Sequence, residues 1–253
     1  MKAYGRGVLL LLTAITVAVI TTITTLYGQS QVNDKAASPA NQPQKTELDD
    51  RLPVLDLRSP QPDDPVGPER RRKRNARYDN SSLVRKDDSY GNHYGVTSSS
   101  EWEWELSPLP APQSEVILVG RVVGAGRAHL SNDKTGIYSE FPVTVEEVFK
   151  NASSSPLEAG GRVDVQRIDG VVHYPNGRKF PYRIGGQNMP INGLRYVFFL
   201  KSAGAEQAYE VVAAFELREG TVFPLDTPDL FDPYKDMEQA RFFEQLRNAV
   251  GQR

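Results

Sequence analysis

The sequence predicts a mainly β domain, a small barrel or a sandwich with one C-terminal amphipathic helix, preceded by a transmembrane helix and a disordered tether. All ten Phe and both Trp lie after residue 100, which places the expected core of the folded domain there. Apolar residues there alternate with period two in short runs, which is typical of β-strands. We therefore expect three regions: 1–28, 29–100 and 101–253.

The first region contains an apolar run long enough to cross a bilayer. Residues 8–26 comprise thirteen apolar residues and six Thr without a charge, and nineteen helical residues rise about 28 Å, close to the hydrocarbon thickness. Lys2, Arg6 and the free amino terminus favour a cytoplasmic N-terminus. We expect a single-pass anchor with an extracytoplasmic C-terminal domain, periplasmic in a Gram-negative cell. A cleaved signal peptide, which would release a secreted form, is the alternative.

Residues 29–100 have the composition of a disordered tether. They contain no Ile, Phe or Trp and seven Pro, which is too little apolar surface to offset the entropy of ordering. Proline also disfavours helix in this region. Formal charge is +2 in 1–28, +1 in 29–100 (12 basic minus 11 acidic residues) and −5 in 101–253 (16 minus 21).

One segment of the tether is strongly basic. Six cations lie between residues 70 and 77: Arg70, Arg71, Arg72, Lys73, Arg74 and Arg77. Such a run can bind phosphates, anionic lipid or an acidic partner with a steep dependence on salt. Alternatively, it is a solvated block of charge that keeps the tether open.

The third region reads as about seven short strands followed by a helix. Pro175-Asn176-Gly177 between two β-like runs is the strongest hairpin signal in the chain. Gly120, Gly124 and Gly126 favour a bulged strand over a nucleotide-binding loop. After Asp232 and Pro233, which suit a helix start, an apolar stripe is expected at Met237, Ala240, Phe243, Leu246 and Val250.

Three of these runs resemble a known family. The segments 115–122, 141–151 and 193–201 are similar to the core of netrin-type and metalloprotease-inhibitor-like modules, which also occur in anchored bacterial proteins. The resemblance covers roughly residues 114–202 and implies a five-stranded OB-like barrel with a flanking helix. Inhibitors of that family act through an N-terminal Cys and disulfides, and this chain has no Cys. The resemblance therefore implies a fold and not an inhibitory mechanism.

The residues with chemical potential are few. The absence of Cys excludes thiol nucleophiles and thiolate metal sites. The three His residues, His93, His129 and His173, share no metal-ligand spacing. We predict no catalytic residue, metal or cofactor. A metal or acid–base role for His129 and His173, meeting near Asp133 or Asp169, is kept as the rival reading.

Two sets of residues are candidates for binding. Trp102 and Trp104 form either a docking surface or part of a first strand. A basic and aromatic groove is expected from Tyr174, Arg178, Tyr182 and Tyr196. The resulting hypothesis is a non-catalytic, membrane-anchored module that binds a protein or an anionic envelope component. The alternatives are an envelope hydrolase or metal-dependent enzyme, and a membrane-tethered nucleic-acid binder, which the −5 charge of the domain disfavours.

Overall fold

The computed structural model describes residues 52–60, 64–81, 95–97, 106–153, 156–204 and 208–251. The chain divides into two units, 1–45 and 46–253, and all described residues belong to the second. The predicted membrane segment 8–26 lies outside the described residues. Within them, no helix is both long enough and apolar enough to cross a membrane.

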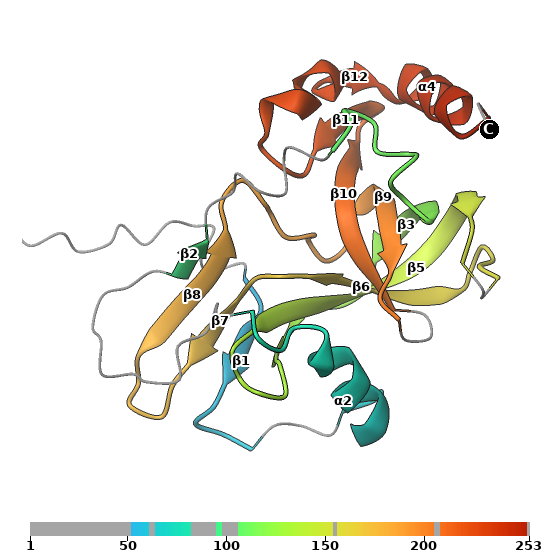
Figure 1. Ribbon diagram of the computed structural model, residues 1–253. Coiled ribbons are helices and arrows are strands. Elements are labelled where there is room, and N and C mark those ends of the chain that lie inside the picture. The colour runs from blue at the N-terminus through green and yellow to red at the C-terminus, as the bar shows by residue number, and fades with distance from the viewer. Residues whose placement is uncertain are drawn as a thin grey trace, which may run out of the picture. The chain divides into compact units, whose positions relative to one another are not determined.

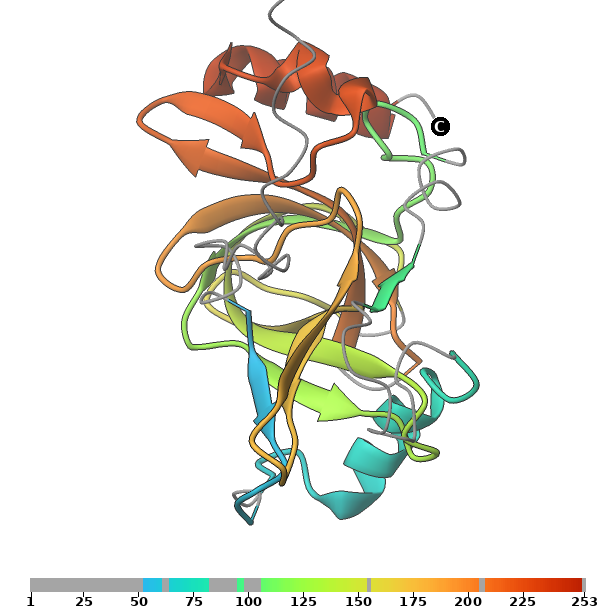
Figure 2. The same cartoon turned by 90° about the vertical axis from the view of Figure 1, so that its left-hand side faces the viewer.

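Five strands form a closed circuit, which confirms the prediction of a mainly β fold. The strands are β3 (Val116–Val122), β5 (Ile137–Asn151), β6 (Arg162–Arg167), β9 (Arg195–Ser202) and β10 (Ala208–Arg218). Their order is β3-β5-β6-β10-β9, and β9 pairs again with β3. All pairs are antiparallel except β6 with β10. Figure 2 shows these strands curving around a shared interior.

Strand β3 is buried on both faces, which explains its continuous apolar run. Val116 and Leu118 belong to the core inside the circuit, whereas Ile117 and Val119 belong to a second core outside it. The register of β3 on β5 shifts before Gly120, as expected for a bulge. A Cβ at Gly120 would lie 2.4 Å from a methyl carbon of Val143, so the close strand approach requires glycine.

The C-terminal segment covers the outer core. It comprises β11 (Thr221–Pro224), a 3-10 helix (Asp229–Tyr234), β12 (Met237–Glu238) and α4 (Gln239–Gly251) (Figure 1). Phe242 and Leu246 of α4 are fully buried, and the Phe242 ring lies 5.1 Å from that of Phe215 on β10. The predicted helix exists, but its start is corrected: Asp232 and Pro233 lie in the 3-10 helix.

A second, smaller sheet has the order β1-β7-β8-β2. It consists of β1 (Val54–Asp56), β7 (Gly170–His173), β8 (Lys179–Ile184) and β2 (Gly95–Thr97). The predicted hairpin at 175–177 joins β7 to β8 and is confirmed, with Gly177 at a φ of +84°. Strand β4 (Arg127–Leu130) pairs with β5 across a turn that contains residues 132–136.

The prediction of disorder over 29–100 is wrong for its described parts. Strand β1 pairs with β7, and residues 68–76 form a helix, α2 (Pro68–Ala76). Proline does not prevent this helix because Pro68 occupies its first turn, where a missing N–H has no helical partner to lose. Leu52, Leu55 and Tyr78 are buried, so this segment contributes to the folded domain.

Candidate functional site

Helix α2 is short and almost entirely polar, so no apolar stripe explains its formation. The placement of its charged residues favours the helix instead. Glu69 lies in its first turn, and Lys73 and Arg74 lie in its last turn, as the helix dipole prefers. Arg71, Arg74, Asn75 and Tyr78 recur at intervals of three and four and share one side. That side faces β5 and β6, which supply Tyr138, Glu140, Asp164 and Gln166 as its partners.

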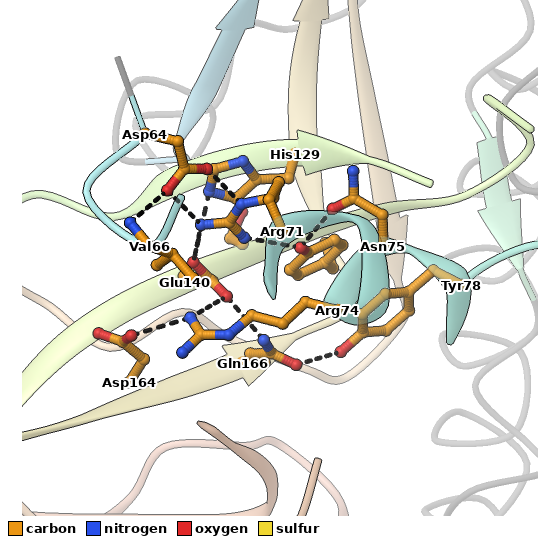
Figure 3. Close-up of polar contacts among 12 residues, drawn as sticks. Asp64, Val66, Arg71, Arg74, Asn75, Tyr78, His129, Glu140, Asp164 and Gln166 are labelled. Carbon is orange, nitrogen blue, oxygen red and sulfur yellow. Dashed lines mark hydrogen bonds and ion pairs between the residues drawn. The ribbon is translucent and has the colours of Figure 1, made fainter. Parts of the chain in front are cut away.

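Glu140 on β5 is the centre of a network of charges beneath α2 (Figure 3). Its Oε2 accepts a hydrogen bond from Arg71 Nη2 at 2.7 Å, and its Oε1 accepts one from Arg74 Nη1 at 2.8 Å. Gln166 Nε2 on β6 also donates to Oε1, at 2.7 Å. Both carboxylate oxygens of this buried glutamate are therefore hydrogen-bonded.

Two further carboxylates complete the pairing of the arginines. Arg74 Nη1 donates to Asp164 Oδ2 at 2.9 Å, and Arg71 forms a two-nitrogen contact with the carboxylate of Asp64. Arg74 is only 4% exposed. Burial of such a guanidinium is tolerable only with this degree of pairing, since an isolated buried charge carries a large desolvation cost.

Aromatic hydroxyls and amides extend the network along α2. Arg71 Nη1 donates to the Tyr138 hydroxyl at 2.8 Å, and that hydroxyl donates to Asn75 Oδ1 at 2.7 Å. The Tyr78 ring stacks on Tyr138 with centroids 4.1 Å apart, and its hydroxyl donates to Gln166 Oε1 at 3.1 Å. These directional contacts fix one register of the helix on the strands.

The network sets the protonation states of its members. Burial acts to raise the pKa of Glu140, but the hydrogen bond from Arg71 and the charges of Arg71 and Arg74 outweigh it and hold the pKa below its usual value. His129 on β4 has its Nε2 3.5 Å from Glu140 Oε2. Burial, followed by the charge of Arg71, lowers the pKa of His129 to about 4. At neutral pH, Glu140 is therefore charged and His129 neutral.

The residues after α2 dock on the turn between β4 and β5. Asn80 N donates to Asp133 Oδ2 at 2.9 Å, and Asp133 N donates to Asp79 Oδ1 at 3.0 Å. The Ser81 hydroxyl donates to the Thr135 carbonyl oxygen at 2.8 Å. A Cβ on Gly136 would lie 2.2 Å from the Tyr78 carbonyl oxygen, so this close approach requires glycine.

The basic run is divided between two environments. Arg71 and Arg74 face the strands, so the interpretation of the whole run as a solvated block is wrong for these two residues. Arg70, Arg72 and Lys73 are exposed. Arg77 also pairs with the sheet, with its Nη2 3.0 Å from Glu210 Oε2. The helix therefore presents three exposed cations on a fixed base.

The predicted aromatic groove is not assembled as expected. Tyr174 and Tyr182 share a hydroxyl–hydroxyl hydrogen bond of 2.8 Å in the smaller sheet, and Arg178 is exposed beside the hairpin turn. Tyr196 is fully buried in the barrel core, where its hydroxyl accepts a hydrogen bond from the Ile191 amide. Tyr196 therefore does not contribute to a surface groove. Trp102 and Trp104 lie outside the described residues.

The two described histidines belong to different sheets. His129 contacts Glu140 from β4, whereas His173 on β7 has its Nδ1 3.7 Å from Asp56 Oδ2. Their carboxylate neighbours are thus not the Asp133 and Asp169 that the sequence suggested. Over the described part of the chain, no group of three or more His, Asp and Glu is placed to hold a metal ion.

A second buried ion pair fixes the loops at the other side of β6. Arg167 Nη1 and Nη2 lie 2.5 and 2.6 Å from the two oxygens of Asp226, and both side chains are 1% exposed. Arg167 also donates to the Asn188 carbonyl, and Asn188 Nδ2 donates to the Leu225 carbonyl at 2.7 Å. This pair holds the segments around 188 and 226 against the barrel.

Sequence reasoning missed the residues that pair with the α2 segment. Arg71 and Arg74 were candidates, but their partners in the network were not: Asp64, Tyr138, Glu140, Asp164 and Gln166. The pattern gave no sign of burial, because Glu140 precedes the apolar alternation of Phe141 and Val143, and Gln166 follows that of Val163 and Val165, at positions that period two assigns to solvent. Compared with known proteins, the chain matches no protein family and none of the curated proteins.

Proposed function

We propose that the chain is a non-catalytic, membrane-anchored binding module of the extracytoplasmic space, and that the exposed side of α2 contacts anionic lipid headgroups. One observation carries the proposal: α2 uses Arg71 and Arg74 to fix itself on the barrel and holds Arg70, Arg72 and Lys73 outward. A basic cluster on a rigid base loses less side-chain and backbone freedom on binding than the same residues in a disordered segment.

The magnitude of such a contact is sufficient to orient the domain. Each Lys or Arg near an anionic membrane surface contributes about 1 kcal/mol, so the three cations contribute at most about 3 kcal/mol, or roughly a hundredfold in affinity, because Lys73 Nζ also lies 3.5 Å from Glu69 Oε1. The predicted anchor ends at residue 26, and the first described residue is Leu52. The intervening 25 residues span at most about 90 Å when fully extended. A linker of this length permits α2 to reach the headgroups of the bilayer that would hold the anchor.

The fold supports a binding module. Numbering β3, β5, β6, β9 and β10 as one to five, the circuit has the order one-two-three-five-four and a parallel pair between three and five. A closed five-stranded circuit is compatible with an OB-type barrel, and with the netrin-type resemblance of residues 114–202. OB-type barrels commonly serve as binding scaffolds.

The surroundings of His129 support the same conclusion for the charge network. A general base works best with a pKa near the operating pH, whereas the pKa of His129 is lowered to about 4. Its carboxylate neighbour Glu140 has both oxygens engaged by arginine side chains. The network is arranged to hold a helix, and this arrangement favours a binding function over proton transfer.

A single introduced cysteine tests both location and lipid contact, because the chain has no Cys of its own. Ala76 is exposed on α2. In intact cells, Ala76→Cys should react with a membrane-impermeant maleimide before lysis. A fluorophore can then be attached at the same site of the full chain in nanodiscs. Spin-labelled lipid should quench its fluorescence when phosphatidylglycerol is present, and high salt should remove the quenching.

A triple variant and a matched control separate this contact from net charge. Replacing Arg70, Arg72 and Lys73 with Gln should abolish the quenching. The control, with the exposed Lys201, Lys235 and Arg241 replaced by Gln, removes the same charge from other surfaces and should retain it. Equal quenching in phosphatidylcholine alone, or loss in both triple variants, would contradict the lipid contact. Labelling only after lysis would contradict the extracytoplasmic location.

A further inference from the structure

We infer that the barrel surface beneath α2 is a receptor site for a helix bearing arginines three residues apart and a tyrosine four residues further on, and that a second copy of this chain can supply that helix. In the structure, the site is filled by Arg71, Arg74 and Tyr78 of the same chain (Figure 3). This inference concerns the inner side of α2 and is independent of the lipid contact.

The site has distinct positions for each side chain. Glu140 Oε2 and the Tyr138 hydroxyl receive the first guanidinium, at 2.7 and 2.8 Å. Glu140 Oε1 and Asp164 Oδ2 receive the second, at 2.8 and 2.9 Å. Arg71 engages Asp64, Tyr138 and Glu140 through three different nitrogens, which an ammonium group cannot do in the same geometry. The first position therefore recognises arginine and not merely positive charge, whereas the second places one guanidinium nitrogen, Nη1, between two carboxylates.

The tyrosine position sets the register. Tyr78 is buried against Tyr138 and donates to Gln166, which in turn donates to Glu140. A shift of the helix by one residue would remove this stack and move both guanidinium groups from their acceptors. Two arginines and one tyrosine at fixed spacing thus define the ligand.

The occupant is a continuous segment that the barrel does not need for its own strand pairing. The backbone hydrogen bonds from Arg71 N to Gly67 O through Asp79 N to Ala76 O lie within residues 67–79, and the α2 backbone meets the barrel through a side chain, with Asn132 Nδ2 donating to the Arg72 carbonyl oxygen at 3.0 Å. The only apolar residues within α2 are Pro68 and Ala76. Docking of the helix itself therefore rests on side-chain hydrogen bonds and ion pairs, with the Tyr78 stack following it.

An emptied site would strongly favour refilling. Without α2, Glu140 and Asp164 would remain as neighbouring carboxylates that have lost their arginine partners, and Glu140 lies in a part of the sheet that is buried in the intact domain. The same helix from a second copy restores every contact, which is the low-cost route to dimers that exchange of an identical element provides.

Two complementary full-length variants test this exchange. In one, Arg71→Gln and Arg74→Gln remove the ligand and leave the receptor intact. In the other, Glu140→Gln damages the receptor and leaves the ligand intact. In neutral detergent, each variant alone should remain monomeric, and an equimolar mixture should form a heterodimer. A monomeric mixture, with protection of the α4 amides unchanged in both variants, would overturn exchange between copies.

A peptide tests the receptor site itself. A labelled peptide of residues 64–81 should bind the Arg71→Gln, Arg74→Gln chain, and Glu140→Gln on that chain should weaken binding by at least tenfold. Replacing Arg71 and Arg74 of the peptide with Lys should also cost at least tenfold. Replacing Arg70 and Arg72 with Lys keeps the same charge and should change little. Equal binding of the two Lys peptides, or no binding, would overturn arginine recognition.

If the double Gln variant does not fold, the chain with Arg71→Lys and Arg74→Lys replaces it as the receptor. That variant keeps both positive charges and loses only the guanidinium geometry. The wild-type peptide should therefore compete with the variant's own α2 for the receptor site. Failure of the peptide to displace this weakened helix would overturn the proposal in the same way.

Discussion

Helix α4 places Phe242 and Leu246 against the barrel, whereas α2 places Arg71 and Arg74 there. The two helices dock on different parts of the same closed circuit of strands, α4 over the outer core of β3, β9 and β10 and α2 over β5 and β6 (Figure 1). The aromatic cluster under α4 is stabilised by burial of apolar area. This contribution is non-directional and does not select one particular apolar side chain as the partner. The network under α2 is stabilised by directional contacts between charges.

This difference separates stability from selectivity. Apolar packing tolerates repacking by other side chains of similar volume. A buried charge network does not, because removing one member leaves the others unpaired and desolvated. We therefore expect α4 to determine whether the domain is folded, and α2 to determine what occupies the face of β5 and β6.

The largest effect is expected from Phe242→Ala. The ring is fully buried and packs against Phe215 and Tyr234, so its removal should lower the free energy of unfolding by about 3–5 kcal/mol. Urea denaturation of the full chain measures this loss. The exposed neighbour Glu244→Ala serves as control and should change stability by no more than about 0.5 kcal/mol. A small loss for Phe242→Ala would contradict the role assigned to α4.

Glu140→Gln should cost a comparable free energy, but the structural effect should be confined to α2. The substitution leaves Arg71 and Arg74 without their shared carboxylate, and breaking a buried pair in this way costs about 3–5 kcal/mol. The loss should appear as release of α2, with the barrel retained, in limited proteolysis that maps the first cut to residues 61–81. Glu146→Gln, at a more exposed glutamate paired with Arg195, should leave the cutting pattern unchanged.

A pH dependence follows from His129. Its pKa is about 4 in the folded protein against 6.5 as the reference value, so the unfolded chain binds a proton that the folded chain does not. Stability should therefore fall as the pH decreases from 6.5 toward 4, by about 2 kcal/mol at pH 5. Glu140 has a lowered pKa and adds its own loss only below about pH 4.5.

His129→Gln removes this titration. In urea denaturation between pH 7.5 and 5, the variant should lose most of the slope that the natural sequence shows. An unchanged slope would mean that His129 is protonated without penalty in the folded domain, and would contradict its neutral state beside Arg71.

The smallest effect is expected at the edge of the network. Arg77 and Glu210 form a partly exposed pair at 3.0 Å, and such pairs contribute about 0.2–1 kcal/mol. Arg77→Gln should leave α2 docked and shift the urea midpoint only slightly. A loss as large as that of Glu140→Gln would show that the network extends further along the helix than its buried members.

The two helices also differ in how far the sequence could predict them. Helix α4 was expected because Phe243, Leu246 and Val250 recur at helical intervals, although the fully buried Phe242 was not in the predicted stripe. Helix α2 was missed because periodicity detects apolar faces, and its buried face is made of arginines. Its residues were read as a disordered tether on composition alone.

The mainly β class and individual turns and bulges followed from local patterns, and the site did not. The hairpin at 175–177 and the bulge at Gly120 depend on neighbouring residues, so turn chemistry was sufficient to predict them. Glu140 lies 66 residues from Arg74 in sequence and 26 from Gln166. Such pairs become visible only when strand pairing brings them together.

Hydrogen exchange of the full chain, compared between the natural sequence and Glu140→Gln, tests the central claim most directly. The account predicts that the amides of α2, residues 71–76, lose their protection in Glu140→Gln while those of α4, residues 243–251, keep theirs. Loss of protection in both helices would show that the charge network supports the whole fold. Unchanged protection in α2 would show that the network does not hold the helix, and would contradict the account.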